Sequence, residues 1–194
     1  SARRDTMNCC LFNVKDVLTG GFEMGNLWYN EPKTLEVAFD VIGDIVLSAA
    51  SQQYGGFTVP SVDLLLEPFA EKSYEKYYRR YIDMGLTARI ADREAMKDIQ
   101  KDFDQGFQGW EYKFNTVASS RGDYPFITMT FGTGTGKFAK IASITMLNVR
   151  RKGQGKKNCK KPVLFPKLVF LYDENLHGAG KELEDVFEAG ILCS

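Results

Sequence analysis

Two adjacent cysteines near the start of the chain, Cys9 and Cys10, are the first residues whose chemistry could matter. They lie in the apolar run 7–12, which predicts a buried strand because it is too short for a helix. Adjacent strand residues point to opposite faces of a sheet, so the two thiols cannot serve one site together. Their spacing fits no zinc site, whose paired ligands stand about two to four residues apart. For either thiol alone, packing as a small buried hydrophobe is the simpler interpretation.

A glycine-rich run, Gly132–Gly136, follows one predicted strand and precedes a predicted helix. It is not a P-loop, because Phe131 stands at the leading glycine position and Phe138 replaces the hydroxyl residue after Lys137. It also breaks the dinucleotide-binding fingerprint, since Lys137 stands where the third glycine belongs. Two interpretations remain open: backbone N–H groups that bind an anion at the helix N-terminus, or a tight strand-to-helix turn.

Charge is segregated along the chain, although 25 basic and 25 acidic side chains leave no formal net charge. The neutral total argues against a protein that coats a polyanion. Residues 124–172 nevertheless contain ten Lys or Arg and no Asp or Glu, so the remaining residues sum to −10. Such a cluster could meet phosphates; a solvated loop balanced by acidic neighbours is the simpler interpretation.

Other counts exclude several classes of protein. His177 is the only histidine, which rules out a histidine-based triad or a multi-histidine metal centre within this chain. No apolar stretch approaches the ~20 residues that span a bilayer, and no signal peptide opens the sequence. Four cysteines make a poor disulfide framework for 194 residues. We therefore expect a reduced, soluble, cytoplasmic chain.

The elements that must position these residues follow from hydrophobic periodicity. In chain order, we expect a helix over 35–54, a helical region from Ser61 that Pro68 either interrupts or restarts, a charged helix over 87–104 that resumes over 110–117, a strand over 126–131, a helix over 137–151, a basic loop over 150–161, an apolar strand over 163–172 and a short helix over 181–189. Strand, glycine turn, helix and apolar strand form a βαβ unit, whose two strands are typically parallel.

Seven short motifs, in this order, resemble the catalytic core of the anaerobic (class III) ribonucleoside-triphosphate reductases, a family of glycyl-radical enzymes. They are NCCLF at 8–12, GGFEMGN at 20–26, EPKT at 31–34, ASQQYGG at 50–56, PFITMTFGTGTG at 125–136, FPKLVF at 165–170 and LEDVFEAGILCS at 183–194. The resemblance covers nearly the whole chain. It implies an α/β fold, the first half of a ten-stranded α/β barrel, helix-rich with few parallel strands, as one partial catalytic domain over 1–194.

The resemblance also implies roles for two cysteines. Cys9 matches the family's barrel-strand cysteine, and Cys193 matches the finger-loop cysteine that becomes a thiyl radical. In the family mechanism, that thiyl removes the ribose 3′-hydrogen, and the 2′-hydroxyl leaves as water. Cys9 then delivers a hydrogen that helps to reduce the substrate radical, while formate or a thiol reductant supplies the electrons. The alternation of the strand would place Cys10 in the packing layer under the helices.

Members of the family bind deoxynucleotide or ATP effectors at a specificity site in a homodimer interface. By motif position, Lys33 in EPKT and Lys76 in a tyrosine-rich helix are candidates for contacts with effector phosphates. The helices expected over 35–54 and 69–81 are then the natural dimer-forming elements. Packing is the more usual role of such a tyrosine-rich face than base stacking.

The cofactors that the resemblance implies belong to parts of the parent protein beyond this chain. They are a glycyl radical, generated by a radical S-adenosylmethionine activating protein with an iron–sulfur cluster, and a structural zinc. We therefore expect no cofactor or metal in this chain, no nucleic-acid or membrane partner, and no turnover by the chain alone. An effector-binding or dimerisation module without catalysis is the alternative function. A formate-lyase relative fits the motifs less well.

Overall fold

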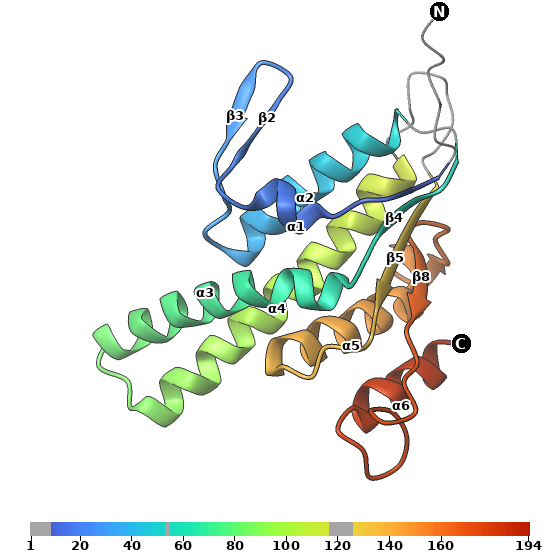
Figure 1. Cartoon of the computed structure of the whole chain (residues 1–194). Coiled ribbons are helices and arrows are strands. Elements are labelled where there is room, and N and C mark those ends of the chain that lie inside the picture. The colour runs from blue at the N-terminus through green and yellow to red at the C-terminus, as the bar shows by residue number, and fades with distance from the viewer. Residues whose placement is uncertain (1–8, 53–54, 117–125) are drawn as a thin grey trace, which may run out of the picture.

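The computed structural model describes residues 9–52, 55–116 and 126–194. Its short strands are interspersed with mostly longer helices (Figure 1). They are β1 (Cys10–Leu11), α1 (Val14–Leu18), β2 (Phe22–Met24), β3 (Leu27–Tyr29), α2 (Leu35–Ala50), β4 (Phe57–Val59), α3 (Val62–Asp83), α4 (Ala88–Thr116), β5 (Ile127–Phe131), α5 (Lys137–Lys152), β6 (Gln154–Lys156), β7 (Cys159–Lys161), β8 (Lys167–Phe170) and α6 (Glu184–Cys193).

Four of the strands form one parallel sheet in the order β1-β4-β5-β8. β5, α5 and β8 make the βαβ unit that the sequence predicted, with Met129 paired to Leu168 and Phe131 to Phe170. β2 with β3 and β6 with β7 form two separate antiparallel hairpins. The expected α/β class with few parallel strands is therefore confirmed.

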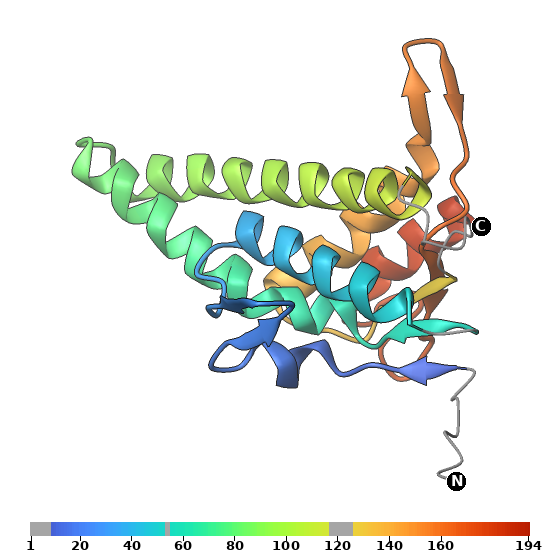
Figure 2. The same cartoon turned by 90° about the horizontal axis from the view of Figure 1, so that it is seen from above.

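The sheet packs its helices on one face only. On β5, Ile127, Met129 and Phe131 are fully buried, whereas the alternate residues Thr128 and Thr130 are half-buried. The buried side chains belong to the same apolar core as those of α2, α3, α4 and α5. Figure 2 shows these helices gathered on one side of the strands. The opposite face of the sheet carries no helix of the described residues.

Two helices are longer than the sequence predicted. α3 runs through Pro68 without a break; Leu64 and Pro68 both lie on its exposed side, where water can bind the carbonyl that proline leaves without a partner. α4 is continuous from Ala88 to Thr116, because Gly106 lies within it against the ring of Phe39 on α2. The packing of that ring offsets the low helix propensity of glycine.

Other differences concern short elements. β4, α1 and the β2–β3 hairpin were not predicted, since runs of three to five residues carry little periodicity. The basic loop over 150–161 is in fact a β-hairpin with a two-residue turn at Lys157-Asn158. α2 ends at Ala50. Positions 53 and 54 of that predicted helix, position 117 of the next charged one, and positions 7 and 8 of the first predicted strand lie outside the described residues.

None of the helices in the described ranges has the length and apolar character that a membrane span requires.

Replacing Gly106 by alanine is expected to destabilise the chain by about 2 kcal/mol. A Cβ at this position would lie 2.3 Å from Cδ2 of Phe39, so the α2–α4 contact must open. Gly109→Ala, one turn along the same helix, is the control: its Cβ would meet nothing within 4 Å, and helix propensity predicts a gain of about 0.5–1 kcal/mol. Urea unfolding measures the change in the free energy of unfolding for both variants. A change of the same sign in the two variants would contradict the close contact between Gly106 and Phe39.

Candidate functional site

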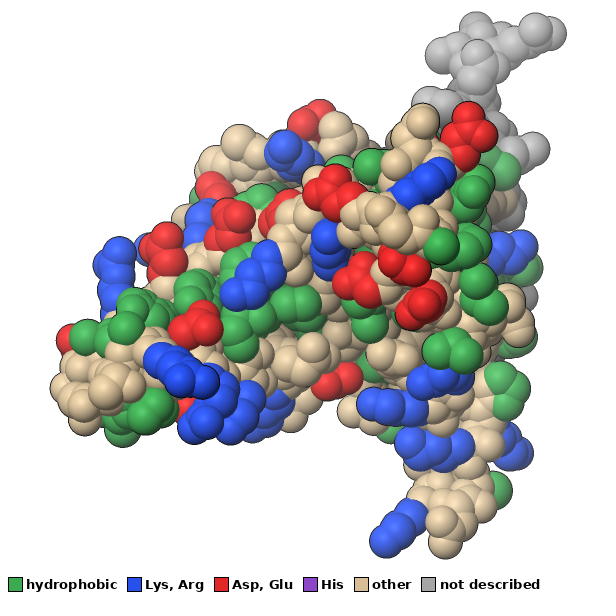
Figure 3. Space-filling model, turned by 90° about the horizontal axis from the view of Figure 1, so that it is seen from below, with side chains coloured by type: hydrophobic (Ala, Val, Ile, Leu, Met, Phe, Trp, Pro, Cys, Tyr) green, Lys and Arg blue, Asp and Glu red, His purple; other side chains and the backbone are tan. Residues whose placement is uncertain are grey.

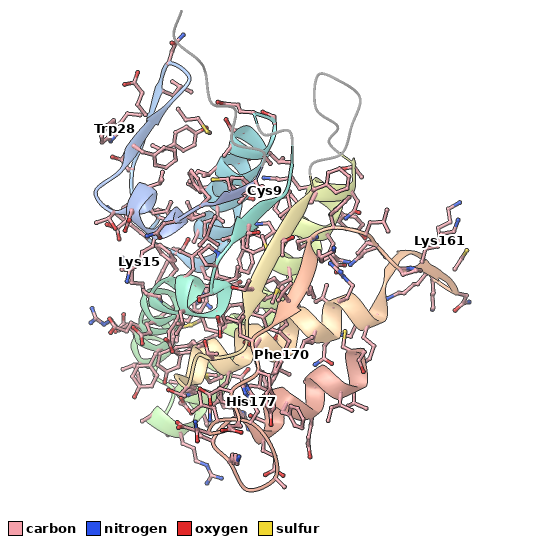
Figure 4. The ribbon with its side chains drawn as sticks, turned by 45° about the vertical axis from the view of Figure 1, so that its right-hand side comes forward. Cys9, Lys15, Trp28, Lys161, Phe170 and His177 are labelled. Carbon is pink, nitrogen blue, oxygen red and sulfur yellow. The ribbon has the colours of Figure 1, made fainter. Side chains whose placement is uncertain are left out.

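Cys9 and Cys10 lie at an edge of the parallel sheet and face different surroundings. The Cys10 N–H donates to the carbonyl of Gly56 at 2.9 Å, which starts the pairing of β1 with β4. Cys10 is half-buried and packs against the apolar core, whereas the next residue, Leu11, is 72% exposed. Cys9, directly before β1, is exposed (Figure 4). By strand alternation, Cys9 shares the uncovered face of the sheet with Leu11.

Cys193 lies at the end of α6, next to the opposite edge strand. Its Sγ is 3.5 Å from the carbonyl oxygen of Leu147 on α5. It lines a cavity of about 550 Å³ whose walls are largely apolar, with Arg150 and Lys167 as the cations. Burial raises the pKa of the Cys193 thiol above its ordinary value, although Arg150 and Arg151 act in the other direction. The sulfur therefore keeps its hydrogen at neutral pH.

The structure does not bring the two candidate catalytic sulfurs together. Cys9 stands beside β1 on the uncovered face, and Cys193 stands beside β8 on the helix-covered side. Three strand spacings separate β1 from β8, which is roughly 14 Å across the sheet alone. A site that uses both sulfurs thus requires the segment with Cys193 to move from its position against α5.

The glycine run after β5 binds an anion that the chain itself supplies. Asp63 on α3 is only 1% exposed, and its Oδ2 accepts hydrogen bonds from the backbone N–H of Gly132 at 3.0 Å and of Gly134 at 2.9 Å. The Ser143 hydroxyl lies 3.4 Å from the same oxygen. Both open interpretations are therefore correct in part: the turn is tight, and its N–H groups are taken by a carboxylate rather than by a phosphate.

His177 contacts the same glycine turn through the carbonyl oxygen of Gly132. Its ring is fully buried, with Nε2 2.7 Å from the carbonyl oxygen of Gly132. Nδ1 lies 2.9 Å from the backbone N–H of Asp173, so it accepts, and Nε2 must carry the hydrogen that it donates to Gly132. Phe170 and Tyr172 pack around the ring. The only histidine is thus a structural support between β5 and the segment after β8.

The two lysines proposed for effector phosphates, Lys33 and Lys76, are both exposed. The segment that carries Lys33 is fastened to the turn of α3 that carries Lys76. The Leu35 N–H donates to the buried Ser73 hydroxyl at 2.7 Å, and Lys72 forms an ion pair with Glu31 at 2.9 Å. The two lysines therefore belong to one surface region at the start of α2 and the middle of α3.

The tyrosine-rich face of α3 packs against α4. The Tyr74 hydroxyl donates to Asp92 at 2.6 Å, and this bond raises the pKa of Tyr74 to about 12. The Tyr77 hydroxyl donates to Asp102 at 2.7 Å. The pKa of Tyr77 is raised well above its ordinary value, mainly by burial and second by this hydrogen bond. These contacts join two helices, so the face is not a free platform for stacking bases.

Within the parts of the chain that the structure describes, no three His, Cys, Asp or Glu side chains are grouped so that they could hold a metal ion.

Comparison with known proteins agrees with the motifs. The profile of the family described as anaerobic ribonucleoside-triphosphate reductase matches residues 2–194. The reductase of that name from Enterobacteria phage T4 is 37% identical over 170 residues, covering 88% of this chain and 27% of the phage protein. The one from Salmonella typhimurium is 35% identical over 188 residues, covering 96% of this chain and 26% of its own length. The chain therefore spans about a quarter of the relatives that it matches.

Among solved structures, the anaerobic ribonucleotide reductase from Thermotoga maritima, in complex with dATP and CTP, resembles this chain with a TM-score of 0.52. The two sequences are 14% identical, and the likeness covers 75% of this chain and 26% of that one. At this identity the comparison supports the arrangement of helices and strands alone. The resemblance expected from the seven motifs is confirmed.

Proposed function

Because the chain belongs to the anaerobic ribonucleoside-triphosphate reductase family, we propose that it forms part of the catalytic core of an enzyme that reduces ribonucleoside triphosphates to deoxyribonucleoside triphosphates. The match over residues 2–194 carries this proposal. The uncovered sheet face beside Cys9 supports it, since parallel sheets are normally covered on both faces. In the proposed enzyme, the remaining strands of a ten-stranded barrel enclose this face.

In this mechanism, Cys193 and Cys9 act on opposite sides of the ribose. Burial against α5 raises the pKa of the Cys193 thiol, so the sulfur keeps its hydrogen at neutral pH before the segment moves into the chamber. A thiol that keeps its hydrogen can lose it as an atom to become a thiyl radical. The thiyl takes the 3′-hydrogen, the 2′-hydroxyl leaves as water, and the Cys9 thiol gives a hydrogen to the substrate radical. Formate or a thiol supplies the remaining electrons. An enclosed chamber protects these intermediates from water.

The proposed oxidant of Cys193 is a glycyl radical formed by a radical S-adenosylmethionine activating protein. We place that glycine and a structural zinc in other segments of the parent enzyme. For the zinc, the reason is that the four cysteines of this chain stand at positions 9, 10, 159 and 193 and do not show the paired spacing of a zinc site. What this chain contributes is the position of the two thiols and the shape of one side of the chamber.

The isolated chain is expected to yield no deoxynucleotide when it is incubated with an activating protein, formate and a ribonucleoside triphosphate. A complete reductase carrying the same segment should turn over in parallel. The separation of Cys9 from Cys193 by the sheet also favours the second candidate, a nucleotide-binding or dimerisation module, for the chain by itself. Turnover by the isolated chain would overturn this assignment.

Effector binding at the surface region with Lys33 and Lys76 is part of the proposal, with a homodimer as its setting. Lys76→Gln is expected to weaken binding of dATP, dGTP or dTTP roughly tenfold, which corresponds to one lost charge-assisted phosphate contact of about 1.4 kcal/mol. Lys97→Gln on α4, also exposed, is the matched control and should leave binding unchanged. Titration calorimetry measures both, and an equal effect of the two changes would place the effector elsewhere.

A further inference from the structure

The β6–β7 hairpin projects from the body of the molecule at the end of α5 (Figures 2 and 4). Its strands pair Gln154 with Lys161 and Lys156 with Cys159, and Asn158 at the turn has a φ of 68°. Its side-chain hydrogen bonds with α4 are made at the base of the hairpin, where Gln154 donates to Glu111 at 2.5 Å and accepts from Gln108 at 3.2 Å. A fixed base therefore supports an exposed tip.

Residues 151–161, here called the basic hairpin, carry six cations and no carboxylate. All six are exposed: Arg151, Lys152, Lys156, Lys157, Lys160 and Lys161. Among the described residues, none of the six has a carboxylate oxygen within ion-pairing distance. Figure 3 shows the projecting segment at its lower right with basic side chains and no acidic ones. The acidic neighbours expected to balance this segment are not seen.

The charged surface of α4 shows that this is not the general pattern in the molecule. There, Arg93 and Lys97 both pair with Glu94, at 3.0 Å and 2.9 Å. Six like charges on a short hairpin repel one another unless an external anion neutralises them. The hairpin thus offers an anion partner a compact, uncompensated positive surface.

The composition of the basic hairpin favours phosphates over a protein surface. Protein interfaces depend on a few buried aromatic or large apolar anchors, and Cys159 is the only apolar side chain in residues 151–161. The same absence leaves nothing to insert into a lipid layer. Lysines act as point charges on phosphate oxygens, and a two-stranded ribbon is narrow enough to enter the major groove of a duplex.

We propose that the basic hairpin binds the phosphate backbone of nucleic acid without sequence preference. From the sequence we expect no nucleic-acid partner and favour a basic segment balanced by acidic neighbours, but none of the described ion pairs involves these six cations. The hairpin connects the C-terminus of α5 to the start of β8, so it lies at the amino ends of the strands. None of residues 151–161 lines the cavity that contains Cys193, so the inference goes beyond the proposed function.

Fluorescence anisotropy of a short labelled duplex with the full chain tests the proposal. Binding is expected at about 50 mM salt, with log K falling against log[salt] at a slope between about −3 and −5, because each neutralised phosphate contributes about −0.9. Combined Lys156→Gln, Lys157→Gln, Lys160→Gln and Lys161→Gln should weaken binding roughly 100-fold and flatten the slope. The thermal midpoint should not move, since these side chains are exposed.

The matched control removes four exposed cations from another surface: Arg89→Gln, Arg93→Gln, Lys97→Gln and Lys101→Gln on α4. It changes net charge equally and should leave duplex binding within a few-fold of the parent. Equal losses in the two variants would overturn the proposal, as would no binding at low salt. Polyglutamate that competes as well as DNA would assign the hairpin to acidic proteins instead, and inorganic tripolyphosphate that competes as well would assign it to free polyphosphates.

Discussion

Replacing Cys9 by serine in a complete reductase that carries this segment is expected to lower kcat/KM on the order of 10³-fold or more, about 4 kcal/mol in barrier height. Serine is nearly isosteric with cysteine, but its O–H bond is too strong to give a hydrogen atom to a carbon radical. Because Cys9 is exposed and does not pack in the core, the stability of the protein should not change. Deoxynucleotide formation under anaerobic conditions provides the measurement.

Cys10→Ser provides the matched control for this prediction. Cys10 packs against the apolar core under the helices, so the hydroxyl should cost about 1 kcal/mol of stability and leave kcat/KM within a few-fold of the parent. Loss of turnover in Cys10→Ser with full activity in Cys9→Ser would reverse the assignment. The contrast isolates the face of β1 that carries the chemistry.

Replacing Glu111 by alanine is expected to destabilise the chain by about 3–5 kcal/mol, the largest stability effect predicted for this fold. Glu111 is 4% exposed and accepts from Arg150 Nε at 2.7 Å, while the same guanidinium donates to the carbonyl of Pro166 at 2.7 Å. Removing the carboxylate leaves Arg150 largely buried without its counter-charge. It also loosens the segment before β8, because the guanidinium that the carboxylate holds in place donates to the carbonyl of Pro166.

Two variants separate this explanation from general damage to α4. Glu75→Ala removes an exposed ion pair with Arg79 on α3 and should change stability by less than about 0.5 kcal/mol. The double change Glu111→Leu with Arg150→Met removes both charges together and should recover much of the lost stability. Urea unfolding gives the free energy of unfolding of Glu111→Ala, of Glu75→Ala and of the double variant. A double variant no more stable than Glu111→Ala would show that the ion pair is not the cause.

Much of the fold could be predicted from the sequence where periodicity is long. The βαβ unit of β5, α5 and β8 and the buried helix α2 follow from runs of four to sixteen residues with one dominant period. β4 and β1 could not be bounded, because two or three residues show no period. The predicted helix break near Gly106 was wrong because a tertiary contact keeps the helix continuous there. Gly106 packs against the ring of Phe39 on α2, which is distant in the sequence.

The candidate site was predictable only in part. Composition alone left Cys9 and Cys10 equivalent, and their assignment came from the motif resemblance together with strand alternation. Asp63 and Glu111 were missed, because each finds its partners about 40 or more residues away in sequence. For Asp63 a signal existed: it is the one charged residue in the apolar start of α3, VDLLL, where burial demands a partner.

In the proposed enzyme, Cys9 and Cys193 meet across a substrate chamber once the rest of the enzyme is present. A bifunctional thiol reagent that fluoresces only after both arms react, such as dibromobimane, tests it directly. In a complete reductase carrying this segment, fluorescent bridging of residues 9 and 193 should occur, persist in Cys10→Ser and disappear in Cys9→Ser; the isolated chain should not bridge. Bridging that persists in Cys9→Ser but is lost in Cys10→Ser, or no bridging in the complete reductase, would show that Cys9 and Cys193 do not face each other across the chamber.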